Sequence, residues 1–239
     1  MKPAKTRQIL TPPLTWDAMT GGENYRESLT LQLQPMLAKM YGFHLLKVGA
    51  LSAQIDTSAC AISHQVNVAD SGEELQVKAE ITRLPFESKS VDACLLAHTL
   101  GWSSDPHAVL REVDRVLIDD GWIMVSGFHL ASLLGPGKCV PLLRQRAPWN
   151  SRMFSQMRLM DWLNLLNYEV IFRSRFQVLP WHRQGGKMIS THLPALGCQQ
   201  LIVARKRTFP VIRTPAMRLA AKTPIRAVVS ATRQCREKS

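Results

Sequence analysis

The segment from residue 79 to residue 128 constrains the fold more than any other part of the chain. Two apolar runs, 91–97 and 122–128, are separated by a segment with helical periodicity at roughly 106–117. Both runs are nearly free of polar residues, which is typical of strands buried on two faces. Strand, helix and strand in this order form a βαβ unit. The sequence therefore predicts an α/β fold with a parallel sheet and helices on both faces.

The segment between the two runs has its own start and stop signals. Asp105 followed by Pro106 is a typical helix start, and Asp119-Asp120-Gly121 is a typical stop. The apolar residues of this segment share one face: Val109, Leu110, Val113, Val116 and Leu117. We expect this face to pack on the sheet.

Several features of residues 79–128 occur in the same order in a known family. Glu80 precedes a Leu-Pro-Phe segment at 84–86, and a Val-Asp strand ends near His98. An Arg-Glu-Val-x-Arg-Val-Leu helix at 111–117 then leads through a glycine turn into the next strand. The segment resembles the C-terminal half of the class I S-adenosylmethionine (SAM)-dependent methyltransferase domain, type 11 group. The resemblance implies a doubly wound, mostly parallel seven-stranded sheet, the Rossmann-like methyltransferase fold, with SAM as cofactor.

The turn after the first predicted strand, residues 44–48, is the expected ligand site. In an open parallel sheet a ligand lies at the carboxyl ends of the strands, near the point where strand order reverses. Gly49 follows the strand, and a glycine there lets the backbone approach a ligand and adopt positive φ. Members of the resembling family have an acidic residue before this turn and three glycines in it. Here Lys47 stands at the acidic position, and of the glycines only Gly49 is kept.

This departure leaves two interpretations open. In the first, the turn still binds SAM, with Lys47 pairing with its carboxylate, because a lysine cannot accept a hydrogen bond from the SAM amino group. In the second, residues 44–53 are a strand followed by an ordinary turn. Leu51 favours the second interpretation, because it places a branched side chain where the methionine part of SAM passes in the family.

Two acidic positions are candidates for contacts to the adenosine part of the cofactor. Asp70 lies 21 positions after Gly49, and an acid about 20 residues after this turn binds ribose hydroxyls in nucleotide-binding folds. The alternative is a turn-forming aspartate, with Glu73 or Glu74 in the ribose role. By resemblance, Glu80 and Ile81 recognise adenine through the Glu80 carboxylate and the Ile81 amide. The alternative for this pair is a solvated loop.

No catalytic residue follows from the sequence, and His98 is a weak candidate. Its position after the fourth strand matches a residue that lines the SAM pocket in the family, and an imidazole can accept a proton near neutral pH. A packing role is the alternative. The five cysteines are scattered and lack Cys-x-x-Cys spacing, so we expect neither disulfides nor a metal site, as is typical of the cytoplasm.

The chain divides into three predicted parts. Residues 1–21 contain three prolines and are expected to form a loose leader, and residues 22–204 form the methyltransferase-like domain. Within this domain we expect an amphipathic helix at 25–40 and a shortened connection after Gly49. A variable insert at 129–149, a helix at 153–166 and two final strands at 169–179 and 199–204 complete it. The family places the last strand antiparallel.

The third part, residues 205–239, holds ten Lys or Arg residues and one Glu, and so carries +9 of the net charge of +12. High charge and few aromatic residues predict a disordered tail. Such a tail is either simply solvated or makes weak contacts with nucleic-acid phosphates. It does not predict base stacking, because interleaved aromatic residues are absent.

These observations lead to two functional hypotheses. The first is a SAM-dependent methyltransferase whose acceptor, a small molecule or a macromolecule, attacks the sulfonium methyl in line. A dedicated triad is not required, because the cofactor is already electrophilic. The second is an inactive methyltransferase-like binding or scaffold protein, RNA-associated through its tail. No run of eighteen apolar residues and no hydrophobic signal core occurs, so we expect a cytoplasmic protein without a transmembrane segment.

Overall fold

A computed structural model describes residues 5–6, 10–130, 132, 134–140, 142, 146–177 and 196–207. Its helices are η1 (Trp16–Ala18), α1 (Gly22–Leu37), α2 (Ala50–Ala53), α3 (Thr99–Trp102), α4 (Pro106–Val116), η2 (Pro136–Cys139) and α5 (Gln156–Leu165). Its strands are β1 (His44–Val48), β2 (His64–Ala69), β3 (Val77–Lys78), β4 (Val91–Leu96), β5 (Leu117–Phe128), β6 (Tyr168–Phe176) and β7 (Gln199–Lys206).

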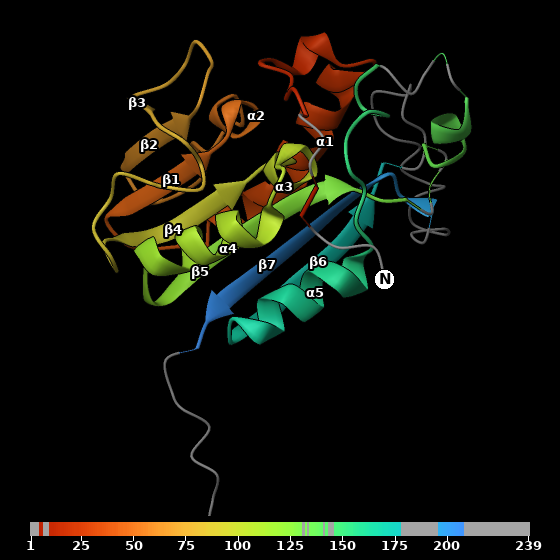
Figure 1. The fold of residues 1–239 in the computed structure, drawn as a ribbon. Helices are drawn as coiled ribbons and strands as arrows, with labels where there is room; N and C mark the ends of the chain where they lie inside the picture. Colours follow the sequence, from red (N-terminus) through yellow and green to blue (C-terminus); the bar gives the residue numbers. More distant parts are fainter. Residues whose placement is uncertain are drawn as a thin grey trace, which may run out of the picture. The chain divides into compact units, whose positions relative to one another are not determined.

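The strands form one seven-stranded sheet in the order β3-β2-β1-β4-β5-β7-β6 (Figure 1). The first five strands in this order pair in parallel, and β7 runs antiparallel to both β5 and β6. The predicted parallel sheet and the antiparallel last strand are therefore confirmed. Strand order reverses at the β1–β4 pair, so the fold places its ligand crevice at the carboxyl ends of these two strands.

The central strand β4 shows why its sequence is almost entirely apolar. Cys94 and Leu96 are buried in one core cluster, whereas Ala93 and Leu95 are buried in the cluster on the opposite face. Successive residues of a strand point to opposite faces, so a strand with helices on both sides has no polar face.

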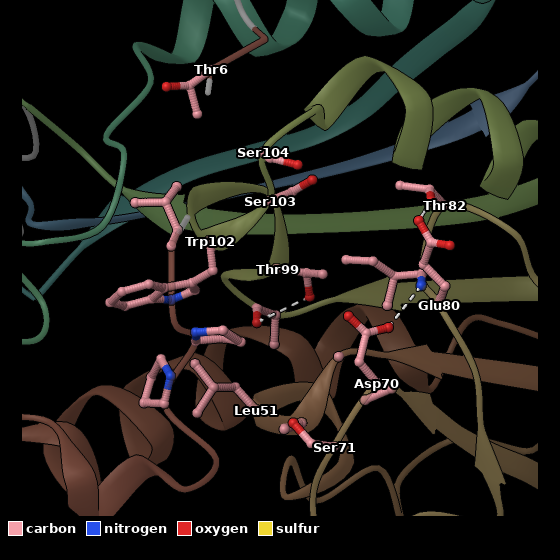
Figure 2. Close-up of a pocket in the computed structure, with 18 residues that line it drawn as sticks. Thr6, Leu51, Asp70, Ser71, Glu80, Thr82, Thr99, Trp102, Ser103 and Ser104 are labelled. Carbon is pink, nitrogen blue, oxygen red and sulfur yellow. Dashed lines mark hydrogen bonds between the residues drawn. The ribbon is translucent and has the colours of Figure 1, made fainter. Parts of the chain in front are cut away.

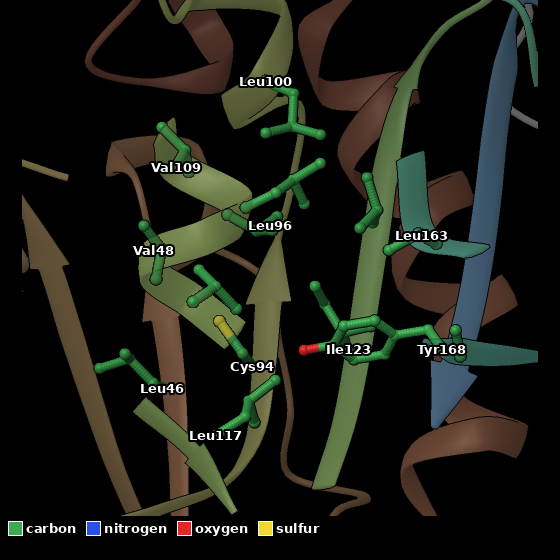
Figure 3. Packing of buried hydrophobic residues seen from close by; sticks show 14 of the residues in the cluster. Leu46, Val48, Cys94, Leu96, Leu100, Val109, Leu117, Ile123, Leu163 and Tyr168 are labelled. Carbon is green, nitrogen blue, oxygen red and sulfur yellow. The ribbon is translucent and has the colours of Figure 1, made fainter. Parts of the chain in front are cut away.

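Helices cover both faces of the sheet, as predicted. The apolar face of α4 packs with α5 against one side, and Figure 3 shows Leu46, Cys94 and Val109 within this cluster. On the other side, Tyr25, Leu29, Leu33 and Leu37 of α1 are buried together with η1 and α2. Asp105 caps the start of α4, and its side chain accepts a hydrogen bond from the Ala108 amide.

The N-terminal segment is packed more closely than the loose leader expected from the sequence. Trp16 is buried, and its indole Nε1 donates to the Leu51 carbonyl at 2.9 Å. Met19 is buried in the same cluster. A short segment without helical periodicity gave no signal for this packing, which depends on the surface that α1 and α2 form together.

One boundary differs clearly from the prediction: β5 begins at Leu117, not at residue 122, so Leu117 and Asp119-Asp120-Gly121 lie in the strand and do not end the helix. Other boundaries differ by small amounts. The connection after β1 contains the four-residue α2, which confirms the shortened crossover. Strand β7 continues to Lys206, two residues past the expected domain end. Residues 181–195 of the long loop and residues 208–239 of the predicted tail lie outside the described residues. In the described part of the chain, every helix is too short or too polar to cross a membrane.

Candidate functional site

A pocket of about 430 Å³ lies at the carboxyl ends of β1, β2 and β4 (Figure 2). This volume is within the range of pockets that bind small molecules and cofactors. Its lining residues are Thr6, Leu10, Pro12, Pro13, Gly49, Ala50, Leu51, Ala69, Asp70, Ser71, Glu80, Ile81, Thr82, Ala97, Thr99, Trp102, Ser103 and Ser104. Four residues expected at the cofactor, Gly49, Asp70, Glu80 and Ile81, are therefore brought together from three separate segments.

Gly49 forms the floor of the pocket and accepts no other residue without strain. Its φ is +96°, and its amide donates to the Val68 carbonyl at 2.8 Å. A Cβ at this position would lie 2.6 Å from the Thr99 Oγ1. The surviving glycine thus keeps the positive φ for which the sequence suggested it, and the close approach that the structure shows is to Thr99.

Two hydroxyl groups join the ends of β1 and β4 beneath the pocket. The Thr99 and Ser52 hydroxyls each donate to the Val48 carbonyl at 2.6 Å. The Ser52 oxygen also accepts from the Ala97 amide at 2.8 Å. All these groups are buried, so the hydrogen bonds hold the floor in one arrangement. The sequence offered no signal for these two roles.

One wall of the pocket is acidic. The Asp70 Oδ1 accepts a hydrogen bond from the Ile81 amide at 3.1 Å, and the Glu80 carboxylate accepts from the Thr82 hydroxyl (Figure 2). Among the described lining residues, Asp70 and Glu80 are the only charged side chains. The wall therefore offers carboxylate oxygens to a ligand with hydroxyl or amino donors.

The N-terminal segment supplies much of the opposite wall. Leu10, Pro12 and Pro13 line the pocket, and the Thr6 amide donates to the Ser104 carbonyl at 2.9 Å. The prediction of a loose leader missed this contribution, because proline-rich sequence alone does not show what a segment packs against.

Trp102 lies across the pocket from Asp70 and Glu80 (Figure 2). Its side chain is 5% exposed, and its Nε1 is buried without a hydrogen-bond partner among the described residues. A buried unpaired donor costs roughly 1–3 kcal/mol. This donor is therefore unsatisfied in the structure, while the Trp102 side chain forms part of the pocket wall. The sequence gave no signal for a role of Trp102 in the pocket.

Lys47 lies outside the pocket lining, in contrast to its expected place at the cofactor. It is 8% exposed, and its Nζ donates to the Ile55 carbonyl at 3.0 Å and to the Ala53 carbonyl at 3.5 Å. Burial lowers the pKa of its amine, and the charges of Asp56 and Glu74 oppose this shift. A cation near the last carbonyls of a helix is favourable, so Lys47 stabilises the end of α2.

His98 also lies outside the lining. It is 1% exposed, with its Nε2 3.0 Å from the Gln199 Oε1 and its ring packed between Trp16 and Phe128. Burial lowers the pKa of its imidazole to about 4, although the hydrogen bond to Gln199 opposes the shift. The described geometry corresponds to the packing role that the sequence left open, because the ring has no access to the pocket.

Leu51 lines the pocket without filling it. Its side chain is buried in the core cluster that contains α1 and η1, and its carbonyl accepts from Trp16. The pocket retains its 430 Å³ beside this side chain. The branched residue in the turn is therefore compatible with a ligand of cofactor size.

Comparison with known sequences gives two results. Residues 41–125 match the model of a methyltransferase domain family. The whole chain is similar to the uncharacterized protein YafS of Escherichia coli (strain K12), with 56% identity over 237 residues that cover 99% of each chain.

Comparison with solved structures shows the same fold in proteins of low sequence identity. One is a SAM-dependent methyltransferase of Thermotoga maritima, with a TM-score of 0.56 and 18% identity over 80% of this chain and 91% of that chain. Another is the [4+2]-cyclase SpnF, with a TM-score of 0.54 and 17% identity over 76% of this chain and 80% of that chain. At these identities the similarity concerns the fold.

Proposed function

The chain belongs to the family of the Escherichia coli protein and carries a methyltransferase domain, and from this premise we propose that it transfers a methyl group from SAM to an acceptor. The site of binding in this proposal is the pocket between Gly49, Asp70 and Trp102. The juxtaposition of Gly49, Asp70 and Glu80 in one pocket is the observation that carries the proposal.

The residues present fit the adenosine part of SAM. Asp70 presents a carboxylate to the vicinal hydroxyls of a ribose, and Glu80 presents one to the amino group of adenine. Both side chains are exposed, so their oxygens are accessible to a ligand. The absence of a Cβ at Gly49 lets its backbone lie against Thr99 beneath the pocket, because a Cβ there would lie 2.6 Å from the Thr99 Oγ1.

The wall opposite Asp70 and Glu80 fits the methionine part of SAM. In this proposal Trp102 turns its buried, unpaired Nε1 toward the carboxylate of SAM, a role for which Lys47 is not in position. Leu10, Pro12 and Pro13 cover this side with apolar surface, which reduces the contact of this wall with water. Excluding water prevents hydrolysis and strengthens the remaining polar contacts.

SAM supplies an electrophilic methyl group on a sulfonium centre. The chain's own contribution is to bind the cofactor, to orient the acceptor and to keep the pocket dry. In this proposal His98 does not remove the acceptor's proton, since it is buried away from the pocket. The acceptor is expected to react in a form that is already nucleophilic, or to lose its proton to solvent.

Calorimetric titration with SAM tests the proposal. Wild-type protein is expected to bind SAM saturably, and Glu80→Ala to bind at least about tenfold more weakly, because a hydrogen bond to a charged group is worth roughly 1.5–3 kcal/mol. Glu87→Ala is the matched control, since Glu87 is an exposed acid outside the lining. Absence of binding at high micromolar SAM would contradict the proposal.

A separate proposal concerns residues 205–239 and their +9 charge. We infer weak contact with nucleic-acid phosphates through this segment, in a cytoplasmic protein whose scattered cysteines suit a reducing compartment. Salt-sensitive retention on immobilised RNA is expected for the whole chain and not after deletion of residues 208–239. Equal retention of both forms would reject this proposal.

A further inference from the structure

Two aromatic rings near the pocket carry three basic side chains. The rings of Phe154 and Trp162 have centroids 5.0 Å apart at an interplanar angle of 64°. The Arg152 guanidinium lies 5.0 Å from the Phe154 centroid. The Arg158 guanidinium lies 5.8 Å from the Phe154 centroid and 5.3 Å from that of Trp162. The His107 ring lies 4.4 Å from Trp162. We call these five residues the basic platform.

The basic platform is connected to the wall of the pocket. The Arg152 amide donates to the Gly101 carbonyl at 2.8 Å, and Gly101 belongs to α3, which supplies Thr99 and Trp102 to the lining. His107 lies in the first turn of α4, three residues after the lining residue Ser104. The platform therefore lies beside the wall that Trp102 and Ser104 form.

The electrostatics of the platform favour an anion. Burial lowers the pKa of the Arg152 guanidinium, the charge of Arg158 lowers it further, and Asp105 opposes both effects. Burial also lowers the pKa of His107, where Asp105 acts in the opposite direction and the charges of Arg111 and Arg158 add to the lowering. These directions show that like charges lie close together, and a bound anion would reduce their repulsion.

Asp105 is the acid that faces this group, and it has other contacts. Its Oδ1 accepts from the Ala108 amide at 3.1 Å, and its Oδ2 lies 3.8 Å from the Lys5 Nζ. One carboxylate thus lies among the charges of Lys5, Arg111, Arg152 and Arg158.

We propose that the basic platform binds a phosphate group of the methyl acceptor, an inference that rests on the proposed function. Arginine binds phosphate through a planar fork of donors, which a lysine cannot match. The rings hold the two guanidinium groups by cation–π contact, so less conformational entropy is lost on binding. The platform's place beside the pocket wall lets the phosphate bind outside while the nucleophilic group of the same molecule enters the pocket.

A phosphorylated small molecule fits the platform better than single-stranded nucleic acid. Proteins that bind single strands stack bases on open aromatic faces. Phe154 and Trp162 are 7% and 6% exposed, and basic side chains lie over them. The rings are therefore occupied in holding the arginines and have little surface for a base.

The experiment is a titration of the full chain with inorganic phosphate at constant ionic strength, followed through the indole N–H resonance of Trp162. The resonance is assigned with a Trp162→Phe variant. We expect a saturable shift in wild type and at least about tenfold weaker binding in Arg152→Gln and Arg158→Gln. Arg173→Gln removes the same charge from an exposed position on β6 and is expected to bind as wild type does.

Several outcomes would overturn the inference. The first is a shift of the Trp162 resonance that does not saturate with phosphate. The second is equal phosphate affinity in the two platform variants and in wild type. The third is an equal response to acetate, which would indicate a carboxylate site. If Arg158→Gln does not fold, Arg158→Lys keeps the charge without the fork and is expected to bind more weakly than wild type. SAM calorimetry on the same samples separates the two proposals. SAM binding without phosphate binding rejects the platform alone, and phosphate binding without SAM binding rejects its assignment to a methyl acceptor.

Discussion

The Asp70 carboxylate accepts a hydrogen bond from the Ile81 amide at 3.1 Å, and so joins the end of β2 to the segment that follows β3. The sequence assigned these two groups to different parts of one cofactor, the ribose and the adenine ring. In the structure the Ile81 amide uses its one donor on Asp70, whereas the Asp70 carboxylate keeps further acceptor sites. For the Ile81 amide to meet an adenine nitrogen, Asp70 must therefore turn toward another donor, for which a ribose hydroxyl is suited.

This relationship predicts that Asp70→Ala weakens SAM binding in spite of freeing the Ile81 amide. The lost ribose contact is expected to raise the Kd by about tenfold or more, because the acceptor is charged. The free energy of unfolding is expected to fall by no more than about 1 kcal/mol, since Asp70 is exposed. Calorimetry and urea unfolding measure the two effects, and Asp161→Ala on α5 is the control. Tighter SAM binding in Asp70→Ala would show that the carboxylate competes with the cofactor instead of holding it.

Trp102→Phe separates a donor role from a packing role. The change keeps an aromatic ring and removes Nε1, which has no partner among the described residues. Removing an unsatisfied buried donor is expected to leave the free energy of unfolding unchanged or to raise it by up to about 1–2 kcal/mol. SAM affinity is expected to fall about tenfold. Unchanged affinity in this variant would assign Trp102 to packing alone.

Gly49→Ala is expected to reduce both stability and SAM binding. The backbone φ of +96° and the 2.6 Å approach to the Thr99 Oγ1 both oppose a side chain. The strain is expected to cost roughly 1–3 kcal/mol in the free energy of unfolding. In the double variant Gly49→Ala with Thr99→Ala, the steric part is relieved and the two changes should destabilise less than additively. If the losses in the free energy of unfolding of the two single variants add exactly in the double variant, the strain comes from the backbone conformation only.

Deletion of residues 1–13 tests the contribution of the N-terminal segment to the pocket. It removes Leu10, Pro12 and Pro13 from the lining and keeps the buried Trp16. We expect faster dissociation of SAM, by roughly tenfold, because the pocket opens to water on that side. The free energy of unfolding should change little. Stopped-flow dissociation measures the rate, with a deletion of residues 1–4 as control, and equal rates in the two deletions would contradict the prediction.

His98 predicts a loss of stability in mild acid. Burial lowers its pKa to about 4 in the folded chain, whereas an unfolded histidine titrates near 6.5. The unfolded state thus binds more protons between these values, so the stabilisation is present above pH 6.5 and is lost as the pH falls toward 4. The loss between pH 7 and pH 5 is about 2 kcal/mol.

Denaturant unfolding at pH 7, 6 and 5 checks this assignment. His98→Asn suits the positive φ of 57° at this position and has no titratable group. The variant is expected to be less stable at pH 7 but to lose less stability on acidification than wild type. If the free energy of unfolding falls by the same amount with pH in both proteins, another group causes the acid sensitivity.

Much of the fold was determined by the sequence itself, because local patterns encode it. The nearly apolar runs 91–97 and 122–128 indicated strands buried on two faces, and the spacing of Val109, Leu110 and Val113 indicated a helix on the sheet. Gly49 and Asp70 were found because each follows a strand in a parallel sheet, where strand ends meet at one edge, and Glu80 was found through the family resemblance of residues 79–128.

Only the tertiary structure decided which side chains reach the pocket. Lys47 and His98 lie next to pocket positions in the chain, yet one binds the end of α2 and the other packs between Trp16 and Phe128. Trp102 and the N-terminal prolines line the pocket without a local signal. Strand periodicity sets where the backbone runs, but the direction of a side chain at a strand end depends on contacts with residues that are distant in sequence.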